Sequence, residues 1–263
     1  MSWEDFNARS QKIKVEEIED VVVIKLNSPE NLNAISSKML EELNEVIDMI
    51  WYLENKSGVI FIGEGKAFSA GADVNELYAL PNIHQAFEYL RRGQKIFSKI
   101  ENLKYLTVAA IDGWALGGGF ELALSCTFRV MTKSAKVGLP EINLGILPGY
   151  GGTQRLSRLI GVQKAKKIIM EGRFIDSQEA LEIGIADQTC ENKESLIKTS
   201  FELLKKFRGK NQTALRYINE LCNISMIGGT DQNFKTEALF CASALSTQFA
   251  KSKISEFLEK RKK

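Results

Sequence analysis

Residues 113–126 read GWALGGGFELALSC, a segment that combines the chain's longest glycine run with a short apolar stretch. Three adjacent glycines cost about 0.5–1 kcal/mol each relative to alanine in regular structure, so they indicate a place where nothing larger fits. Leu122, Ala123, Leu124 and Cys126 follow as the apolar side of a buried helix. We therefore expect a turn that opens a helix near Gly118, where free N–H groups and the helix dipole favour negative charge.

Apolar, β-branched segments on both sides of this turn indicate strands. The expected strands are residues 21–26 (VVVIKL), 58–62 (GVIFI), 106–111 (LTVAAI) and 128–132 (FRVMT). Between the first two, Ser36 and Ser37 precede apolar residues at helical spacing and supply an N-cap. Strands that alternate with helices predict an α/β architecture.

The pattern changes after residue 192, where helical periodicity continues with few strand signals. Leu196, Leu203 and Leu204 mark one helix, a second contains Leu215 and Ile218, and two more reach the C-terminus. We predict an α/β core over residues 1–192 and a helical region over residues 193–263.

Composition limits the classes of protein that fit this chain. Of 263 residues, 44% are apolar and 26% charged, as in soluble globular proteins. A net charge of +2 argues against nucleic acid as a partner, and no apolar run is long enough to span a membrane. The four separated cysteines (Cys126, Cys190, Cys222 and Cys241) predict buried free thiols in a reducing cytoplasm rather than a metal site. An N-terminus without a signal peptide's apolar core also favours the cytoplasm.

Several common catalytic classes lose their support. His84 is the only histidine and lies in an expected surface helix, which leaves a hydrolase triad or a two-histidine metal site without its residues. Ile60 stands where a phosphate loop ending at Gly65 needs a glycine. Gln154 stands at the third glycine position of a dinucleotide fingerprint starting at Gly149.

Three glycine-rich segments remain as candidates for a site: residues 65–73 (GKAFSAGAD), 113–121 (GWALGGGFE) and 138–155 (GLPEINLGILPGYGGTQR). Glu121 and Glu141 both lie among apolar residues, where a carboxylate needs partners or a raised pKa. Each feature also has a simpler interpretation when it is taken alone. Residues 65–73 could form an ordinary tight turn, Glu121 could cap a helix, and Glu141 could be a surface acid. Together, two carboxylates and two turns with free N–H groups suit chemistry on a thioester enolate.

In this order and spacing, the three segments resemble the enoyl-CoA hydratase (crotonase) family over essentially the whole chain. The resemblance implies a spiral of ββα units with a C-terminal helical region that builds trimers, often paired into hexamers. It implies that the N–H groups of Ala70 and Gly118 bind the thioester oxygen. Glu121 and Glu141 would hold a water that adds at C3, with Glu141 supplying a proton to C2. No cofactor is expected beyond the coenzyme A of the substrate.

By the same resemblance, the residues expected to contact substrate and coenzyme A are Asn31, Leu32, Ala34, Lys66, Ala70, Gly71, Ala72, Asp73, Gly117, Gly118, Trp114, Pro140, Leu144, Gly149, Phe257 and Lys260. Three positions depart from the family. Ser28 and Glu30 replace residues that include a basic contact to coenzyme A, and Trp114 replaces a smaller aromatic residue, where it either narrows the acyl pocket or simply packs.

The expected activity is that of a lyase, a reversible hydration of a short-chain 2-trans-enoyl-CoA to a 3-hydroxyacyl-CoA. Double-bond isomerisation is the alternative within the family, and retention of both glutamates argues against it. An RNA-binding or scaffold role through basic residues 163–167 (QKAKK) is a third hypothesis.

Overall fold

The computed structural model describes residues 2–224, 230–245 and 247–260. The chain divides into two compact units, Met1–Lys206 and Phe207–Lys263. The observed boundary lies later than residue 192, because helix α9 (Lys193–Lys205) packs on strands β5 and β7 of the first unit.

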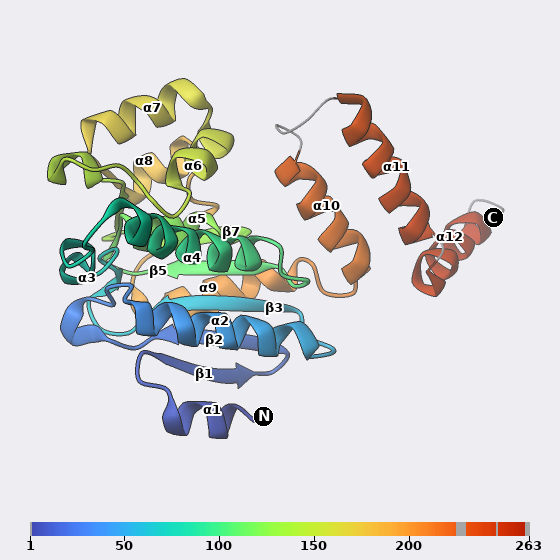
Figure 1. The fold of residues 1–263 in the computed structure, drawn as a ribbon. Coiled ribbons are helices and arrows are strands. Elements are labelled where there is room, and N and C mark those ends of the chain that lie inside the picture. The colour runs from blue at the N-terminus through green and yellow to red at the C-terminus, as the bar shows by residue number, and fades with distance from the viewer. Residues whose placement is uncertain (1, 225–229, 246, 261–263) are drawn as a thin grey trace. The chain divides into compact units, whose positions relative to one another are not determined.

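A six-stranded sheet forms the centre of the first unit (Figure 1). Its order is β1 (Ile13–Ile18), β2 (Val21–Leu26), β3 (Gly58–Gly63), β5 (Thr107–Ile111), β7 (Phe128–Thr132) and β10 (Gln188–Cys190). Strand β1 pairs antiparallel with β2, and all other neighbours are parallel. The four strands predicted from β-branched runs are confirmed to within a residue at each end.

A second sheet of three-residue strands has the order β4 (Ala67–Ser69), β6 (Trp114–Leu116), β8 (Lys136–Gly138) and β9 (Phe174–Asp176). Each of β3, β5 and β7 is followed by one of these short strands and then by helix, so the predicted ββα repetition is present. Three residues are too few for an alternating pattern, which is why sequence analysis did not find the short strands.

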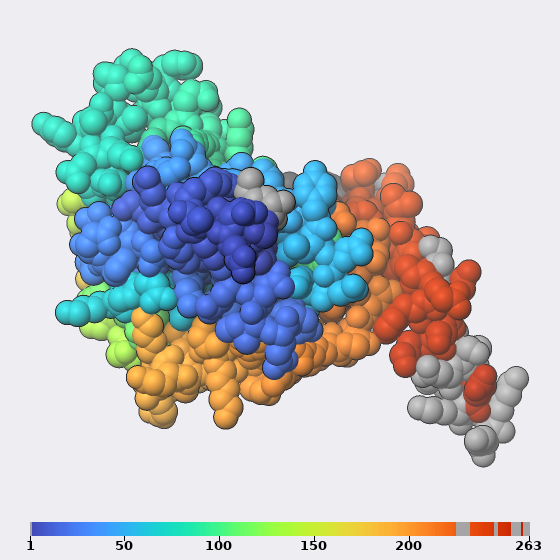
Figure 2. All heavy atoms as spheres, turned by 90° about the horizontal axis from the view of Figure 1, so that it is seen from below, coloured from blue at the N-terminus to red at the C-terminus, as the bar shows by residue number. Residues whose placement is uncertain are grey.

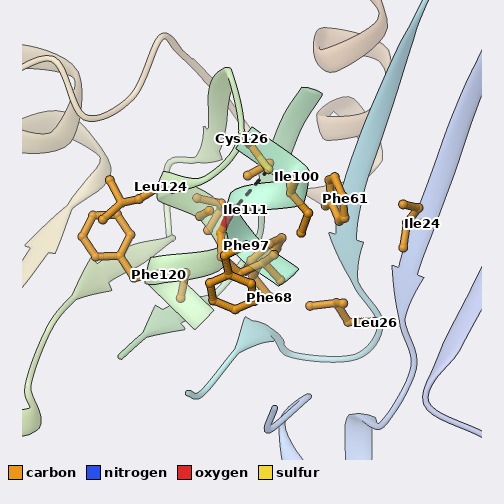
Figure 3. Close-up of a cluster of buried hydrophobic side chains, with 14 of the residues drawn as sticks. Ile24, Leu26, Phe61, Phe68, Phe97, Ile100, Ile111, Phe120, Leu124 and Cys126 are labelled. Atoms are coloured by element: carbon orange, nitrogen blue, oxygen red, sulfur yellow. Dashed lines mark hydrogen bonds between the residues drawn. The ribbon is translucent and has the colours of Figure 1, made fainter. Parts of the chain in front are cut away.

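Helices cover both faces of the large sheet (Figure 1). Helices α2 (Ser37–Tyr52) and α4 (Ile83–Glu101) lie on one face and α9 on the other. Successive strand side chains point to opposite faces, so Val59 and Phe61 join the core under α2 and α4, whereas Ile60 faces away from it. Figure 3 shows this core, in which aromatic and aliphatic side chains from strands and helices interdigitate.

The remaining helices of the first unit surround the two sheets. They are α1 (Trp3–Arg9), η1 (Pro29–Asn31), α3 (Val74–Tyr78), α5 (Gly118–Leu124), η2 (Glu141–Leu144), α6 (Gly152–Ile160), α7 (Val162–Glu171) and α8 (Ser177–Glu182). Seen from below in Figure 2, the N-terminal segment forms the surface of this unit at the edge strand β1.

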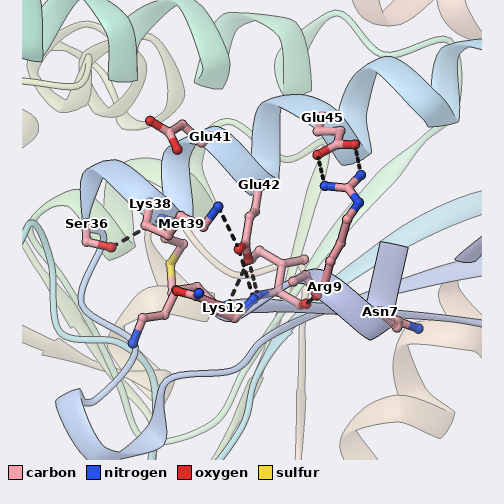
Figure 4. A network of polar contacts seen from close by, with 12 residues as sticks. Asn7, Arg9, Lys12, Ser36, Lys38, Met39, Glu41, Glu42 and Glu45 are labelled. Carbon is pink, nitrogen blue, oxygen red and sulfur yellow. Dashed lines mark hydrogen bonds and ion pairs between the residues drawn. The ribbon is translucent and has the colours of Figure 1, made fainter. Parts of the chain in front are cut away.

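A buried carboxylate fixes that N-terminal segment. Glu42 of α2 is 2% exposed and accepts hydrogen bonds from the backbone N–H groups of Gln11, Lys12 and Ile13 at 2.8–3.0 Å. Lys38 lies 3.4 Å from it on the same helix (Figure 4). The carboxylate thus provides hydrogen-bond acceptors for the backbone N–H groups of the segment that enters β1.

The second unit is helical, as predicted, and contains α10 (Gln212–Ile224), α11 (Thr230–Leu245) and α12 (Gln248–Lys260). The rings of Tyr217 and Phe240 stack at 4.3 Å between α10 and α11. Large apolar side chains stay exposed on this unit, at Ile218, Phe234, Leu239 and Phe249. Within the described ranges, no helix is long and apolar enough to cross a membrane.

Candidate active site

A cavity of about 770 Å³ lies where the three glycine-rich segments meet. The turn after β4 contributes Gly71 and Ala72, the start of α5 contributes Gly118, and the η2 region contributes Glu141. Apolar residues of α3 and α4 form another wall, including Leu77 and Leu90. Segments that lie far apart in the sequence therefore converge on one concave site.

Two backbone N–H groups lie close together where the first two segments meet. The N–H groups of Ala72 and Gly118 donate to no acceptor in the described part of the chain. A Cβ on Gly118 would lie 3.1 Å from the Ala72 nitrogen, and a Cβ on Gly71 would lie 3.6 Å from the Gly118 nitrogen. Two unpaired donors this close together suit an oxygen that gains negative charge.

The geometry corrects the assignment of Ala70 as one of these donors. The Ala70 N–H donates to the carbonyl of Leu32 at 2.9 Å, so it is already engaged. Ala72 replaces it, because the bridge between Ile35 and residues 71–73 uses the Gly71 carbonyl and the Asp73 N–H and leaves the Ala72 N–H free. Sequence analysis named Ala72 only as a contact residue and gave the donor role to Ala70, because both alanines follow the same short strand.

Glu121 lies in the first turn of α5 and is 1% exposed. Its Oε1 accepts hydrogen bonds from the backbone N–H groups of Tyr150 at 2.8 Å and Gly152 at 2.7 Å. Burial is the main cause that raises its pKa to about 7, the charge of Glu141 adds to it, and the two N–H groups act in the opposite direction. A carboxyl with such a pKa exchanges protons readily near neutral pH.

Glu141 begins η2 and lines the same cavity. Its Oε2 is buried and has no hydrogen-bond partner among the described residues, and burial raises the pKa of this carboxyl to about 7. A Cβ on Gly117 would lie 3.3 Å from its Oε1, so glycine at residue 117 leaves room for the carboxyl. The site therefore contains two carboxyls with raised pKa values beside a pair of free N–H groups.

Most of the predicted contact residues in the three segments line the cavity. These are Ala70, Gly71, Ala72, Gly117, Gly118, Pro140, Leu144 and Gly149, together with both glutamates. Tyr150 lines it as well and was missed, although a large aromatic residue inside the small-residue run PGYGG was an available signal.

Other predicted contact residues lie away from the cavity lining. Asn31, Leu32 and Lys66 are exposed, Ala34 is half-buried, and Asp73 caps α3 by accepting from the Asn75 N–H. The side chains of Phe257 and Lys260 lie outside the described residues.

Trp114 packs rather than narrowing the cavity. Its ring makes an edge contact with Phe174 at 5.2 Å, and the Lys136 ammonium lies 5.5 Å from its centroid. This contact joins β6 to the neighbouring short strands of the second sheet.

Ser28 and Glu30, which depart from the family pattern, both contact a basic residue from another part of the chain. The Lys12 ammonium lies 2.8 Å from the Ser28 hydroxyl and 3.3 Å from the Glu30 carboxylate. Ser28 donates to Glu30, which lowers the pKa of that carboxyl. A cation therefore stands beside this turn, although it comes from a different segment than expected.

His84 is exposed on α4, as predicted. None of the four cysteines, all of which the structure describes, forms a disulfide, but only Cys126 and Cys190 are buried. The expectation of burial is wrong for Cys222 and Cys241, which lie in the helical unit. No cluster of metal-ligating side chains occurs within the described ranges.

Comparison with known proteins finds a match over residues 16–263 to the family described as enoyl-CoA hydratase/isomerase. A probable enoyl-CoA hydratase of Bacillus subtilis is 38% identical, covering 92% of this chain and 93% of that protein. A short-chain-enoyl-CoA hydratase of Clostridium acetobutylicum is also 38% identical, covering 92% of each. A solved enoyl-CoA hydratase structure from Bacillus anthracis superposes with a TM-score of 0.87 at 34% identity, covering 95% of this chain and 97% of that one.

Proposed function

Since the chain belongs to the enoyl-CoA hydratase/isomerase family, we propose that it is an enoyl-CoA hydratase, a lyase that adds water reversibly to a 2-trans-enoyl-CoA. The product is a 3-hydroxyacyl-CoA, formed by syn addition. The observation that carries the proposal is the convergence of Glu121, Glu141 and the two free N–H groups on one cavity. The presence of both acids favours hydration over double-bond isomerisation, because one can act on the water while the other acts on C2.

In the proposed mechanism, the thioester oxygen accepts hydrogen bonds from the N–H groups of Ala72 and Gly118. These donors stabilise the negative charge that the oxygen gains as the enolate forms, and loss of one such donor typically costs about 3–4 kcal/mol. The positive end of the helix dipole at the start of α5 acts in the same direction.

The two glutamates divide the proton transfers. Ionised Glu121 takes a proton from the water as its oxygen bonds to C3, and protonated Glu141 gives a proton to C2. Hydrogen bonds to Oε1 of Glu121 fix that side chain and leave its other oxygen for the water. Because both pKa values are raised to about 7, one ionised and one protonated carboxyl can coexist at neutral pH.

This scheme draws only on the chain's own residues and the coenzyme A of the substrate, so no further cofactor is proposed. For the second unit we propose assembly into trimers or pairs of trimers, supported by the large apolar side chains that it exposes. A cytoplasmic location is proposed as well, supported by four cysteines that form no disulfide in the described residues.

The test follows loss of crotonyl-CoA absorbance in the wild-type protein, Glu121→Gln and Glu141→Gln, with Glu54→Gln as a matched control. Glu54 is an exposed glutamate outside the cavity lining. We expect rapid hydration by the wild type and the control, and a loss of at least about 100-fold in each of the other variants. If the wild type leaves 2-enoyl-CoA thioesters unchanged but moves the double bond of a 3-enoyl-CoA, the protein is an isomerase.

A further inference from the structure

One aromatic side chain of the cavity is placed where an acyl chain would extend. Tyr150 lies in the turn before α6, and although the residue lines the cavity, it is only 1% exposed. Its ring is held between two glycines of different elements. A Cβ on Gly118 would lie 3.0 Å from its Cδ2, and a Cβ on Gly93 of α4 would overlap its Cδ1 and Cε1. The ring therefore fills the space between α4 and the start of α5.

This position is at the reacting end of the cavity. Gly118 carries one of the two free N–H groups, and the backbone N–H of Tyr150 itself binds Glu121 at 2.8 Å. An acyl chain whose carbonyl is held at Gly118 consequently begins beside this ring. Exposed apolar residues such as Val74 and Leu147 also line the cavity and mark where it opens to solvent.

Helix α4 closes the remaining space around the turn. Gln94 donates from Nε2 to the Gly149 carbonyl at 2.8 Å, and a Cβ on Gly149 would overlap Leu90. Behind the ring lies Phe97, whose ring meets Tyr150 edge-on at 5.4 Å. The Tyr150 ring and its turn are thus packed on several sides by side chains of α4.

The far side of this ring is also unfavourable for an alkyl chain. The hydroxyls of Tyr150 and Tyr89 are both buried and lie close to each other. Their rings are neighbours, with centroids 6.3 Å apart. An apolar chain that displaced the Tyr150 ring would meet polar groups that it cannot satisfy.

We propose that the Tyr150 ring is the closed end of the acyl subsite and limits the enzyme to short acyl chains, with Gly93 providing the room for the ring. This inference rests on the proposed function, because it takes the cavity as an acyl-CoA site. It goes further by assigning the restriction to one side chain. Binding of saturated thioesters tests it without any dependence on hydration.

The experiment measures the Kd of butyryl-CoA and decanoyl-CoA by calorimetry for wild type, Tyr150→Phe, Tyr150→Leu and Tyr150→Ala. We expect the wild type to bind butyryl-CoA at least tenfold more tightly than decanoyl-CoA. Tyr150→Phe keeps the ring and should keep that preference. Tyr150→Ala should bind decanoyl-CoA at least tenfold more tightly than the wild type does, and Tyr150→Leu should lie between, which preserves the test if the alanine variant does not fold.

The inference is overturned if the wild type binds decanoyl-CoA as tightly as butyryl-CoA, or if the smaller side chains leave the ratio unchanged. A protein that shows the expected ratios yet hydrates no enoyl-CoA would overturn the proposed function alone. Binding of neither thioester would overturn both.

Discussion

Replacing Glu121 by glutamine should abolish hydration and at the same time make the folded protein more stable at alkaline pH. The pKa of Glu121 is raised from 4.5 to about 7, mainly by burial. Ionising it in the folded state is therefore disfavoured by about 3 kcal/mol relative to the unfolded chain. Because both N–H groups of residues 150 and 152 bind the same oxygen, Oε1, a glutamine carbonyl can accept them unchanged.

The sign follows from the protonation of the two states. Below pH 4.5 the carboxyl is protonated whether the chain is folded or not, so it contributes no destabilisation. Between pH 4.5 and about 7 the unfolded chain loses the proton first, and the destabilisation grows until the folded carboxyl also ionises.

The assay is denaturant unfolding of wild type and Glu121→Gln at pH 4.5 and pH 8, at one fixed protein concentration. The difference in the free energy of unfolding should shift in favour of the variant by about 3 kcal/mol between the two pH values. Glu54→Gln should change stability by less than about 0.5 kcal/mol at either pH. If the free energy of unfolding differs between wild type and Glu121→Gln by the same amount at both pH values, burial does not raise the pKa of Glu121 as described.

Three further substitutions test other parts of the structure. Glu42→Gln should lower the free energy of unfolding by about 2–4 kcal/mol in denaturant titrations, because it weakens three hydrogen bonds to a buried carboxylate. Replacement of the half-exposed Glu45, which pairs with Arg9, by glutamine should cost less than about 1 kcal/mol. Gly93→Ala should lower thermal stability by about 1–3 kcal/mol through overlap with the Tyr150 ring, and a double-mutant cycle with Tyr150→Ala should recover most of it; additive effects would show that the two do not touch. Gly117→Ala should reduce kcat for crotonyl-CoA at least about tenfold and destabilise by about 1–2 kcal/mol, because residue 117 has φ +48° and its Cβ would press on Glu141; unchanged kinetics would contradict that contact.

Much of the architecture was predictable because its signals are local. Strands β2 and β7 were predicted at their observed bounds, since both are short, mainly apolar segments that contain β-branched residues. Ser36 caps α2 through the Met39 N–H as expected. Glu121 and Glu141 stood out as acids in apolar surroundings, and both line the cavity.

What escaped prediction depends on contacts between distant segments. Whether the N–H of Ala70 or Ala72 is free is decided by the backbone of residues 32–35, which the local pattern of residues 65–73 does not contain. The role of Tyr150 depends on Gly93, more than fifty residues earlier by the numbering, in a helix that looked like ordinary surface. Helix α9 joined the first unit because its apolar face packs on β5 and β7, a tertiary contact that its amphipathic pattern does not specify.

Tyr150 carries two duties on separate atoms, since its main chain positions Glu121 while its ring bounds the cavity. Any amino acid except proline supplies the same N–H, so a change of side chain keeps the donor to Glu121 wherever the surrounding packing tolerates it. An evolving or engineered lineage can therefore change substrate size at this residue by single substitutions that leave the chemistry intact. Descendants of this enzyme could then change the acyl chains that they accept without passing through an inactive intermediate.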